Sequence, residues 1–240
     1  MKIAFIADIH GNSVALERVL EDIEKKRADK IVVLGDICFR GPDPKGSLEK
    51  IRQLETEVIK GNADEWIVRG IKKGEVPDQA FKIMTQERDF GVAQLSDDDI
   101  LYLKNLQEEV KLTVGPYTIH GFHATPNSLF QNVMPDCADE IMEKNLMVDK
   151  TADIYVYAHI HKPFVRFLNG KIVMNTGSVG LPFDGVPSAS YGIIEVDGKN
   201  VKAEICRVEY DVVAVVKMYE TVNYPNSKQM MATIRNGRLS

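Results

Sequence analysis

The chain contains five histidines, and two of them, His159 and His161, stand one residue apart in the segment IYVYAHIHKP. In an extended strand, side chains two residues apart project from the same face at a separation of roughly 6 to 7 Å. Two imidazoles in this arrangement could share one site. An isolated pair of this kind is more often two half-exposed histidines that end a strand, so the rest of the chain must decide.

Other residues capable of chemistry also follow strand-like segments. Asp8 and His10 repeat the one-residue spacing. The five clearest strand-like runs end in Asp8, Asp36, Asn62, His120 and His159. Ligands in open α/β sheets gather at the carboxyl ends of the strands, and each of these residues is a metal ligand or a polar equivalent. Taken singly, each has an ordinary structural explanation, such as a helix cap, a turn residue or a surface histidine. Their joint occurrence predicts one shared site.

The types of these residues indicate which metal ions the site could bind. Carboxylate, amide and imidazole ligands without a thiolate suit Mn, Fe, Ni, Co or Zn. Seven ligands are too many for one ion that keeps open positions, so we expect two ions. Two ions roughly 3.5 to 4 Å apart lower the pKa of a bridging hydroxide and hold phosphoryl oxygens for in-line attack. The predicted ligands are Asp8, His10, Asp36, Asn62, His120, His159 and His161.

The elements that would position these residues begin with an α/β unit. Residues 2–8 form a short apolar run typical of a strand buried on both faces. Asn12 and Ser13 are good helix caps ahead of an amphipathic segment, and 30–36 is a second buried strand, so the unit should be parallel and right-handed. A helix over 42–54 and a strand over 56–62 follow.

After residue 62 the sequence pattern first becomes helical and then becomes strand-like. Residues 63–106 are helical and polar and are expected to form an insertion within a single domain that spans 1–240. After it come strand-like runs with hairpin signals at Asn169-Gly170 and Asp197-Gly198, and a helix near 136–147. We therefore expect an α/β fold: a four-layer α/β/β/α sandwich of two mixed β-sheets flanked by helices.

Composition limits the partners and the location. The 240 residues are 44% hydrophobic and 27% charged, with a formal net charge of −5 and no basic block, so duplex nucleic acid is not expected as a partner. A small anionic substrate is still compatible, because metal ions supply positive charge locally. Three cysteines without CxxC spacing fit a reducing cytoplasm, and neither a signal peptide nor a membrane span is expected. The oligomeric state is left open.

Five segments together resemble the calcineurin-like metallophosphoesterase superfamily: DIHG, GDICFRGPDP, GNAD, HG at 120–121 and AHIH. GPDP and NTGSVGLPFDG are similar to a branch of small bacterial and archaeal phosphodiesterases related to diadenosine tetraphosphate hydrolases. The resemblance implies the four-layer sandwich, and it assigns Asp8, His10, Asp36 and His161 to one ion and Asp36, Asn62, His120 and His159 to the other. GDICFRG also resembles a phosphoprotein phosphatase segment, which makes Arg40 a candidate phosphate ligand; a solvated loop cation is the equal alternative.

One position departs from the family pattern. The resemblance implies a histidine after Asn62 that assists the leaving group, but the chain has Ala63. Without that acid, leaving groups that are weak bases should be favoured. A terminal phosphate, with a pKa of roughly 6, qualifies. The substrate is therefore expected to be a small phosphorylated molecule, nucleotide-like, with a phosphoanhydride or an activated phosphodiester. His123 is the alternative proton donor, although a partly exposed loop histidine is its plainer explanation.

The sequence supports three competing functions less well. A non-catalytic scaffold of the same fold would not need seven ligands, although Ala63 keeps that alternative open. A nuclease is disfavoured by the acidic charge. A Rossmann-type dinucleotide site fails because IADIHGN lacks the glycine pattern that brings the backbone close to a pyrophosphate.

Overall fold

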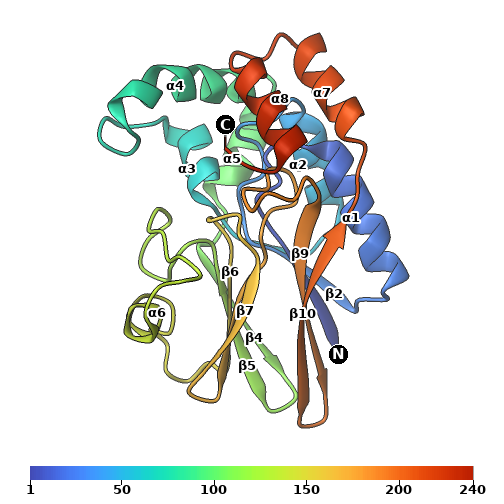
Figure 1. Ribbon diagram of the computed structural model, residues 1–240, viewed down its shortest axis with the longest axis vertical. Helices are drawn as coiled ribbons and strands as arrows, with labels where there is room; N and C mark the ends of the chain where they lie inside the picture. The colour runs from blue at the N-terminus through green and yellow to red at the C-terminus, as the bar shows by residue number, and fades with distance from the viewer. Residues whose placement is uncertain (240) are drawn as a thin grey trace.

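The computed structural model describes residues 1–239, and its strands form two five-stranded sheets (Figure 1). The first sheet has the order β10-β9-β1-β2-β3, and the second has the order β4-β5-β6-β8-β7. The first sheet contains β1 (Lys2–Ile6), β2 (Lys30–Val33), β3 (Glu57–Val58), β9 (Ala189–Asp197) and β10 (Asn200–Val208). The second contains β4 (Glu109–Val114), β5 (Tyr117–Phe122), β6 (Ile154–Tyr157), β7 (Phe164–Leu168) and β8 (Lys171–Asn175). Both sheets mix parallel and antiparallel pairs.

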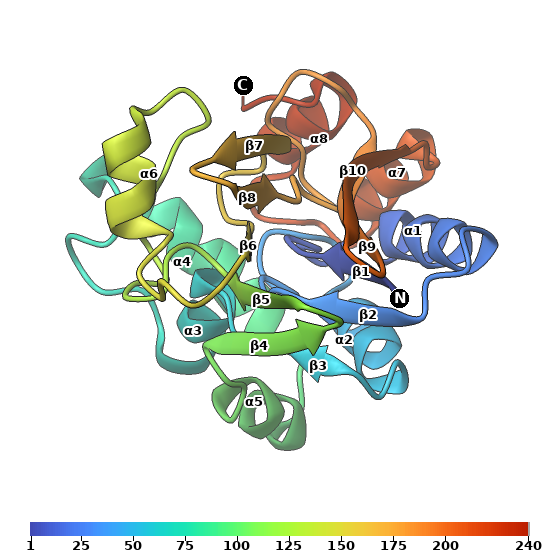
Figure 2. The same cartoon turned by 90° about the horizontal axis from the view of Figure 1, so that it is seen from below.

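Helices cover the outer faces of the two sheets. Figure 2, seen from below, places α6 outside the second sheet and α1 and α7 outside the first. The helices are α1 (Ser13–Lys25), α2 (Pro44–Gln53), α3 (Asn62–Arg69), α4 (Asp78–Val92), α5 (Asp97–Lys104), α6 (Asp139–Asn145), α7 (Val212–Thr221) and α8 (Ser227–Asn236). The expected four-layer sandwich is confirmed.

Three apolar clusters correspond to the three interfaces between layers. Ala4 and Ile6 of β1 face the helices beside Leu16, while Ile3 and Phe5 face the second sheet. This alternation follows from the two-residue period of a strand, and it explains why β1 has no polar face. The third cluster lies between the second sheet and α6 and contains Phe122, Met142 and Tyr155.

Local signals in the sequence agree with the helix and hairpin positions. The Asn12 side chain accepts from the Ala15 N–H and caps α1, and Asp43 caps α2 in the same way. Asn169 and Gly170 have φ of 50° and 74°, so two residues with positive φ make the tight turn between β7 and β8. The segment 63–106 consists largely of α3, α4 and α5, which lie above the edge of the sheets in Figure 1.

The parallel strands share one direction, so their carboxyl ends meet at one edge. β1, β2 and β3 are parallel neighbours, as are β5, β6 and β8. The two edges are joined where the His159 N–H donates to the Asp8 carboxylate at 3.0 Å. The loops that leave this shared edge carry the predicted site.

Candidate metal centre

The loops at this edge have an unusual backbone. Ten residues other than glycine among 1–239 have φ in the left-handed region, and six of them lie here: Asp8, His10, Asp36, Arg40, His159 and His161. A left-handed conformation is costly for residues with a Cβ, and it persists only where the surrounding structure imposes it. Backbone hydrogen bonds impose it here, because the Asp8 and His10 N–H groups donate to the carbonyls of Gly35 and Asp36.

These conformations correct the expectation that each pair of residues lies in an extended strand. β1 ends at Ile6 and β6 ends at Tyr157, so both pairs follow their strands. Within the shared site the two histidines diverge: the His161 ring lies 4.9 Å from that of His10, and the His159 ring lies 5.2 Å from that of His123. His159 and His161 therefore belong to two different groups of side chains.

The first group of candidate ligands comprises Asp8, His10, Asp36 and His161, and all four are buried. The His10 Nε2 lies 3.8 Å from Asp8 and 3.7 Å from Asp36, and the His161 Nε2 lies 3.3 Å from Asp8. The Asp8 Oδ1 has no hydrogen-bond partner among the described residues. A buried carboxylate oxygen without a partner is expensive unless a cation binds it.

The tautomers of the first group also fit a cation. The His10 Nδ1 lies 2.8 Å from the Phe39 carbonyl, and the His161 Nδ1 contacts the Leu181 carbonyl. A carbonyl only accepts, so both Nδ1 atoms carry hydrogen and both Nε2 atoms of the neutral rings present lone pairs. The two Nε2 atoms are 3.2 Å apart. Lone pairs that converge in this way repel each other unless a cation lies among them.

The second group comprises Asp36, His123 and His159, with the amide of Asn62 beside them. The His123 Nδ1 lies 2.7 Å from the Leu34 carbonyl, and its Nε2 lies 3.0 Å from the Asn62 Oδ1 and 3.4 Å from the Asp36 carboxylate. An Nε2 lone pair beside the Asn62 and Asp36 oxygens again fits a cation. Asp36 belongs to both groups, as a bridging carboxylate would.

Electrostatics in the absence of an ion point the same way. Burial is the largest single influence on His123 and would lower its pKa, but the charge and hydrogen bond of Asp36, the charge of Asp8 and the Leu34 carbonyl together raise that pKa to about 9. Burial and the neighbouring His161 lower the pKa of His10 to about 4. Burial and the charge of His123 likewise lower the pKa of His159 to about 4. Without a metal ion, a proton on His123 supplies the positive charge that balances the buried carboxylates. A bound metal ion would supply this charge instead of the proton.

His120 is absent from both groups, and its prediction as a ligand is wrong. Its Nε2 lies 2.8 Å from the Glu109 carboxylate, and its ring packs against Phe122 and Tyr155. The reason is strand alternation: Ile119 faces the first sheet, so His120 faces the α6 layer. His123 follows the end of β5 and occupies the position expected for His120. The sequence signal was present, because both histidines lie in IHGFH.

Asp64 supports both groups, a role that the sequence did not reveal. Its carboxylate accepts from the backbone N–H groups of Asp36, Ile37 and Gly61 at 2.7, 2.9 and 2.9 Å. It thereby ties the loop after β2 to the start of α3. A Cβ at position 61 would overlap the Asp36 carboxylate, so the glycine is required by close approach. The third residue of the helix thus fixes the shared ligand.

A cavity of about 160 Å³ opens beside the two groups. Besides ligand residues it is lined by Phe39, Arg40, Ala63, Trp66, Met84 and Phe183. The Phe183 ring stacks on His161 with centroids 4.2 Å apart. Ala63 is fully buried at the start of α3, and its N–H donates to the Asp36 Oδ1 at 2.7 Å. The aromatic walls were not predicted, because Phe39, Trp66 and Phe183 come from three segments far apart in the sequence.

Arg40 lies at this cavity but is not a freely solvated cation. Its Nε lies 3.4 Å from the fully buried carboxylate of Glu87 on α4, and its backbone carbonyl accepts from the Tyr219 hydroxyl at 2.8 Å. The Asn226 amide donates to the other Glu87 oxygen at 3.0 Å. Helices α4 and α7 and the start of α8 therefore hold the side chain at the cavity wall.

Comparison with known proteins identifies the class. Residues 1–199 match the calcineurin-like phosphoesterase superfamily domain, and the chain belongs to this family. An uncharacterized protein of Methanocaldococcus jannaschii is 31% identical over 92% of this chain and 91% of its own. The phosphodiesterase YfcE of Escherichia coli is 27% identical over 85% and 92%. A metallophosphoesterase structure from Sphaerobacter thermophilus aligns with a TM-score of 0.78 at 26% identity over 99% of each chain.

Two further findings bear on the remaining expectations. Cys38, Cys137 and Cys206 are free cysteines. Within residues 1–239, no helix is long and apolar enough to cross a membrane.

Proposed function

We propose that the protein is a metal-dependent phosphoesterase that hydrolyses a phosphodiester or phosphoanhydride at two metal ions. The observation that carries this proposal is the pair of largely buried ligand groups that share Asp36. We assign Asp8, His10, Asp36 and His161 to one ion, and Asp36, Asn62, His123 and His159 to the other. When bound, the ions would activate water and withdraw charge from phosphoryl oxygens.

The residues of the chain have separate tasks in this reaction. Backbone carbonyls orient the rings of His10, His123 and His161 toward the centre, and Asp64 fixes the loop that carries Asp36. Arg40, oriented by Glu87, lies at the cavity wall where it can bind a phosphoryl oxygen. We assign His123 to the metal and not to proton donation, since both of its nitrogens are engaged within the buried cluster.

Leaving-group chemistry narrows the substrate. Among the described residues lining the cavity, no acid takes the place of the histidine missing at Ala63. A leaving group that is a weak base therefore suits this site, and nucleotide-like phosphoanhydrides have one. The acidic net charge and the small cavity favour a small molecule over duplex nucleic acid.

The test is reconstitution. Metal-free protein would be loaded in turn with Mn, Fe, Ni, Co and Zn, and metal content and hydrolysis of bis-p-nitrophenyl phosphate and diadenosine tetraphosphate would be measured. We expect about two ions per chain and activity that depends on them. A protein that binds ions but hydrolyses neither substrate would support the alternative, a metal-binding scaffold.

A further inference from the structure

A second cavity adjoins the metal centre. It has a volume of about 460 Å³ and shares His159 and Phe183 with the cavity beside the two ligand groups. Because these two side chains line both, a molecule with its phosphorus at the metal centre can extend past Phe183 into this second space. The cavity is about three times as large as the first, so the bulk of such a substrate would lie here.

Two cations line this second cavity. Lys162 directly follows the candidate ligand His161, and Arg238 lies in the segment after α8. Neither forms an ion pair with any residue among 1–239, whereas the nearby Arg166 and Arg207 are paired with Asp139 and Asp184. Two uncompensated cations at one cavity attract an anion and can donate charge-assisted hydrogen bonds to it.

The position of Arg238 is set by the backbone before it. The Gly185 N–H donates to the Gly237 carbonyl at 2.7 Å, which links the end of α8 to the loop that carries Phe183. Gly237 has φ of 62°, and a Cβ there would overlap the backbone of Val186. The chain thus brings Arg238 to the same loop that separates the two cavities.

We propose that this second cavity binds the leaving group of the substrate and that Lys162 and Arg238 recognise a phosphate within it. The proposal rests on the phosphoesterase function proposed above and adds that the scissile bond is a phosphoanhydride. It agrees with Ala63: without a proton donor, a leaving phosphate is stabilised by cations instead. Met134, Ile160 and Leu239 give the cavity apolar wall for the organic part of the leaving group.

The chemistry balances as a hydrolysis. A bond forms between phosphorus and the oxygen of water, and the bond from phosphorus to the leaving phosphate oxygen breaks. The electron pair of the broken bond stays on that oxygen, whose increased negative charge faces Lys162 and Arg238. The two protons of water are distributed over the two phosphate products and solvent according to their pKa values.

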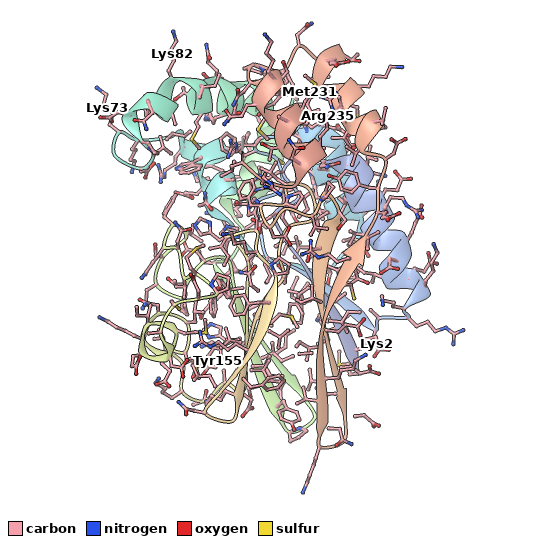
Figure 3. The ribbon with its side chains drawn as sticks, viewed as in Figure 1. Lys2, Lys73, Lys82, Tyr155, Met231 and Arg235 are labelled. Atoms are coloured by element: carbon pink, nitrogen blue, oxygen red, sulfur yellow. The ribbon has the colours of Figure 1, made fainter. Side chains whose placement is uncertain are left out.

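The kinetic test compares two substrates. The leaving group of diadenosine tetraphosphate carries phosphate. The leaving group of bis-p-nitrophenyl phosphate is p-nitrophenolate, which carries none. We expect Lys162→Gln and Arg238→Gln each to lower the ratio of kcat/KM for the first substrate over the second by about tenfold, the typical value of a charge-assisted hydrogen bond. Lys82→Gln is the matched control, since Lys82 is exposed and projects from α4 away from the sheets (Figure 3).

A binding measurement separates this proposal from the activity. ADP would be titrated into metal-free protein in the presence of a chelator, with heat as the readout. We expect wild-type and Lys82→Gln proteins to bind ADP equally and the other two variants to bind about tenfold more weakly. Equal loss on both substrates, or ADP binding indifferent to both cations, would overturn the leaving-group site. Absence of hydrolysis with cation-dependent ADP binding would instead overturn the proposed function alone.

Discussion

The two ligand groups differ in how firmly the fold holds them. In the first group, each imidazole has its Nδ1 engaged by a backbone carbonyl, and every member is buried. In the second group, His123 is held in the same way, but the His159 ring makes no hydrogen bond to a described residue and is only half-buried. His159 also lines both cavities. The first group is therefore held more firmly than the second, although His10 and His161 also line the smaller cavity.

This difference suggests a division of labour. A ligand set fixed by carbonyl acceptors is preorganised, so binding an ion costs little reordering. A ring without a second hydrogen bond can adjust when substrate binds, at the cost of weaker metal affinity. We therefore expect one firmly bound ion and one that exchanges, and the following predictions test that contrast.

The largest effect is expected where the two groups meet. Asp36→Asn should lower hydrolysis by about 10³-fold or more, because a neutral amide cannot neutralise two cations and several kcal/mol of metal-derived stabilisation are lost. Both ions should bind weakly, while the unfolding temperature of the metal-free protein stays near that of wild type. Metal analysis and steady-state kinetics are the measurements, with exposed Asp97→Asn as the control. Full activity with two ions bound would refute a shared ligand.

The contrast itself is tested by removing histidines of the two groups one at a time. His161→Ala and His10→Ala should weaken the same ion by about 100-fold, and His159→Ala should weaken the other. In wild type, loss of metal to a chelator should be biphasic, and His159→Ala should remove the fast phase. Anomalous scattering from crystals identifies which ion is lost. If His10 and His161 lie on different ions, the assignment of the two groups fails.

Ala63→His tests the part of the metal centre formed by the second group. Ala63 adjoins the second group, and general acid catalysis typically contributes 10²- to 10⁴-fold, so an imperfectly placed histidine should raise phenyl phosphate hydrolysis by about tenfold. Diadenosine tetraphosphate should gain little. The wild-type rate should fall steeply as the leaving-group pKa rises, and a flat series would mean that a proton donor is already present.

His123→Ala is the companion variant. As a ligand of the second group, His123 should affect good and poor leaving groups alike when it is removed. A loss confined to poor leaving groups would restore it as the proton donor.

The sequence predicted the edge of the sheets where the candidate site lies, and it named most of the candidate ligands that the structure brings together there. It could do so because buried strands are apolar and are followed within two or three residues by Asp8, Asp36 and His159. It erred at His120, because the face on which a strand residue lies depends on which sheet packs against it. The left-handed backbone of the loops depends on hydrogen bonds between the segments after β1 and β2.

Some of the contacts at the site depend on long-range packing alone. Glu87 reaches Arg40 from α4, and Asn226 reaches Glu87 from the end of the chain. No local pattern of residues specifies such contacts. The second cavity likewise forms only because the segment after α8 is hydrogen-bonded to the loop that carries Phe183.

The smallest effect concerns the wall beside the second group. The Glu75 carboxylate accepts from the Trp66 indole N–H at 3.1 Å and pairs with Arg69 at 2.7 Å. The hydrogen bond from Arg69 is the main cause that lowers the pKa of Glu75 to about 2 from its usual 4.5. A lowered pKa stabilises the fold fully above pH 4.5, and this contribution is lost as pH falls from about 4.5 to about 2. After solvent screening it amounts to about 1 kcal/mol.

Glu75→Gln should therefore cost about 1 kcal/mol of unfolding free energy at pH 6 and progressively less below pH 4. Trp66 is the single tryptophan of the chain, so its fluorescence reports both urea unfolding and the environment of the cavity. Trp66 lies on α3 with Asn62, so loosening it should weaken the exchanging ion and leave the firmly bound ion unaffected. Equal weakening of both ions would show that α3 supports the two groups alike, and the contrast between a firmly held and a less firmly held group would then be lost.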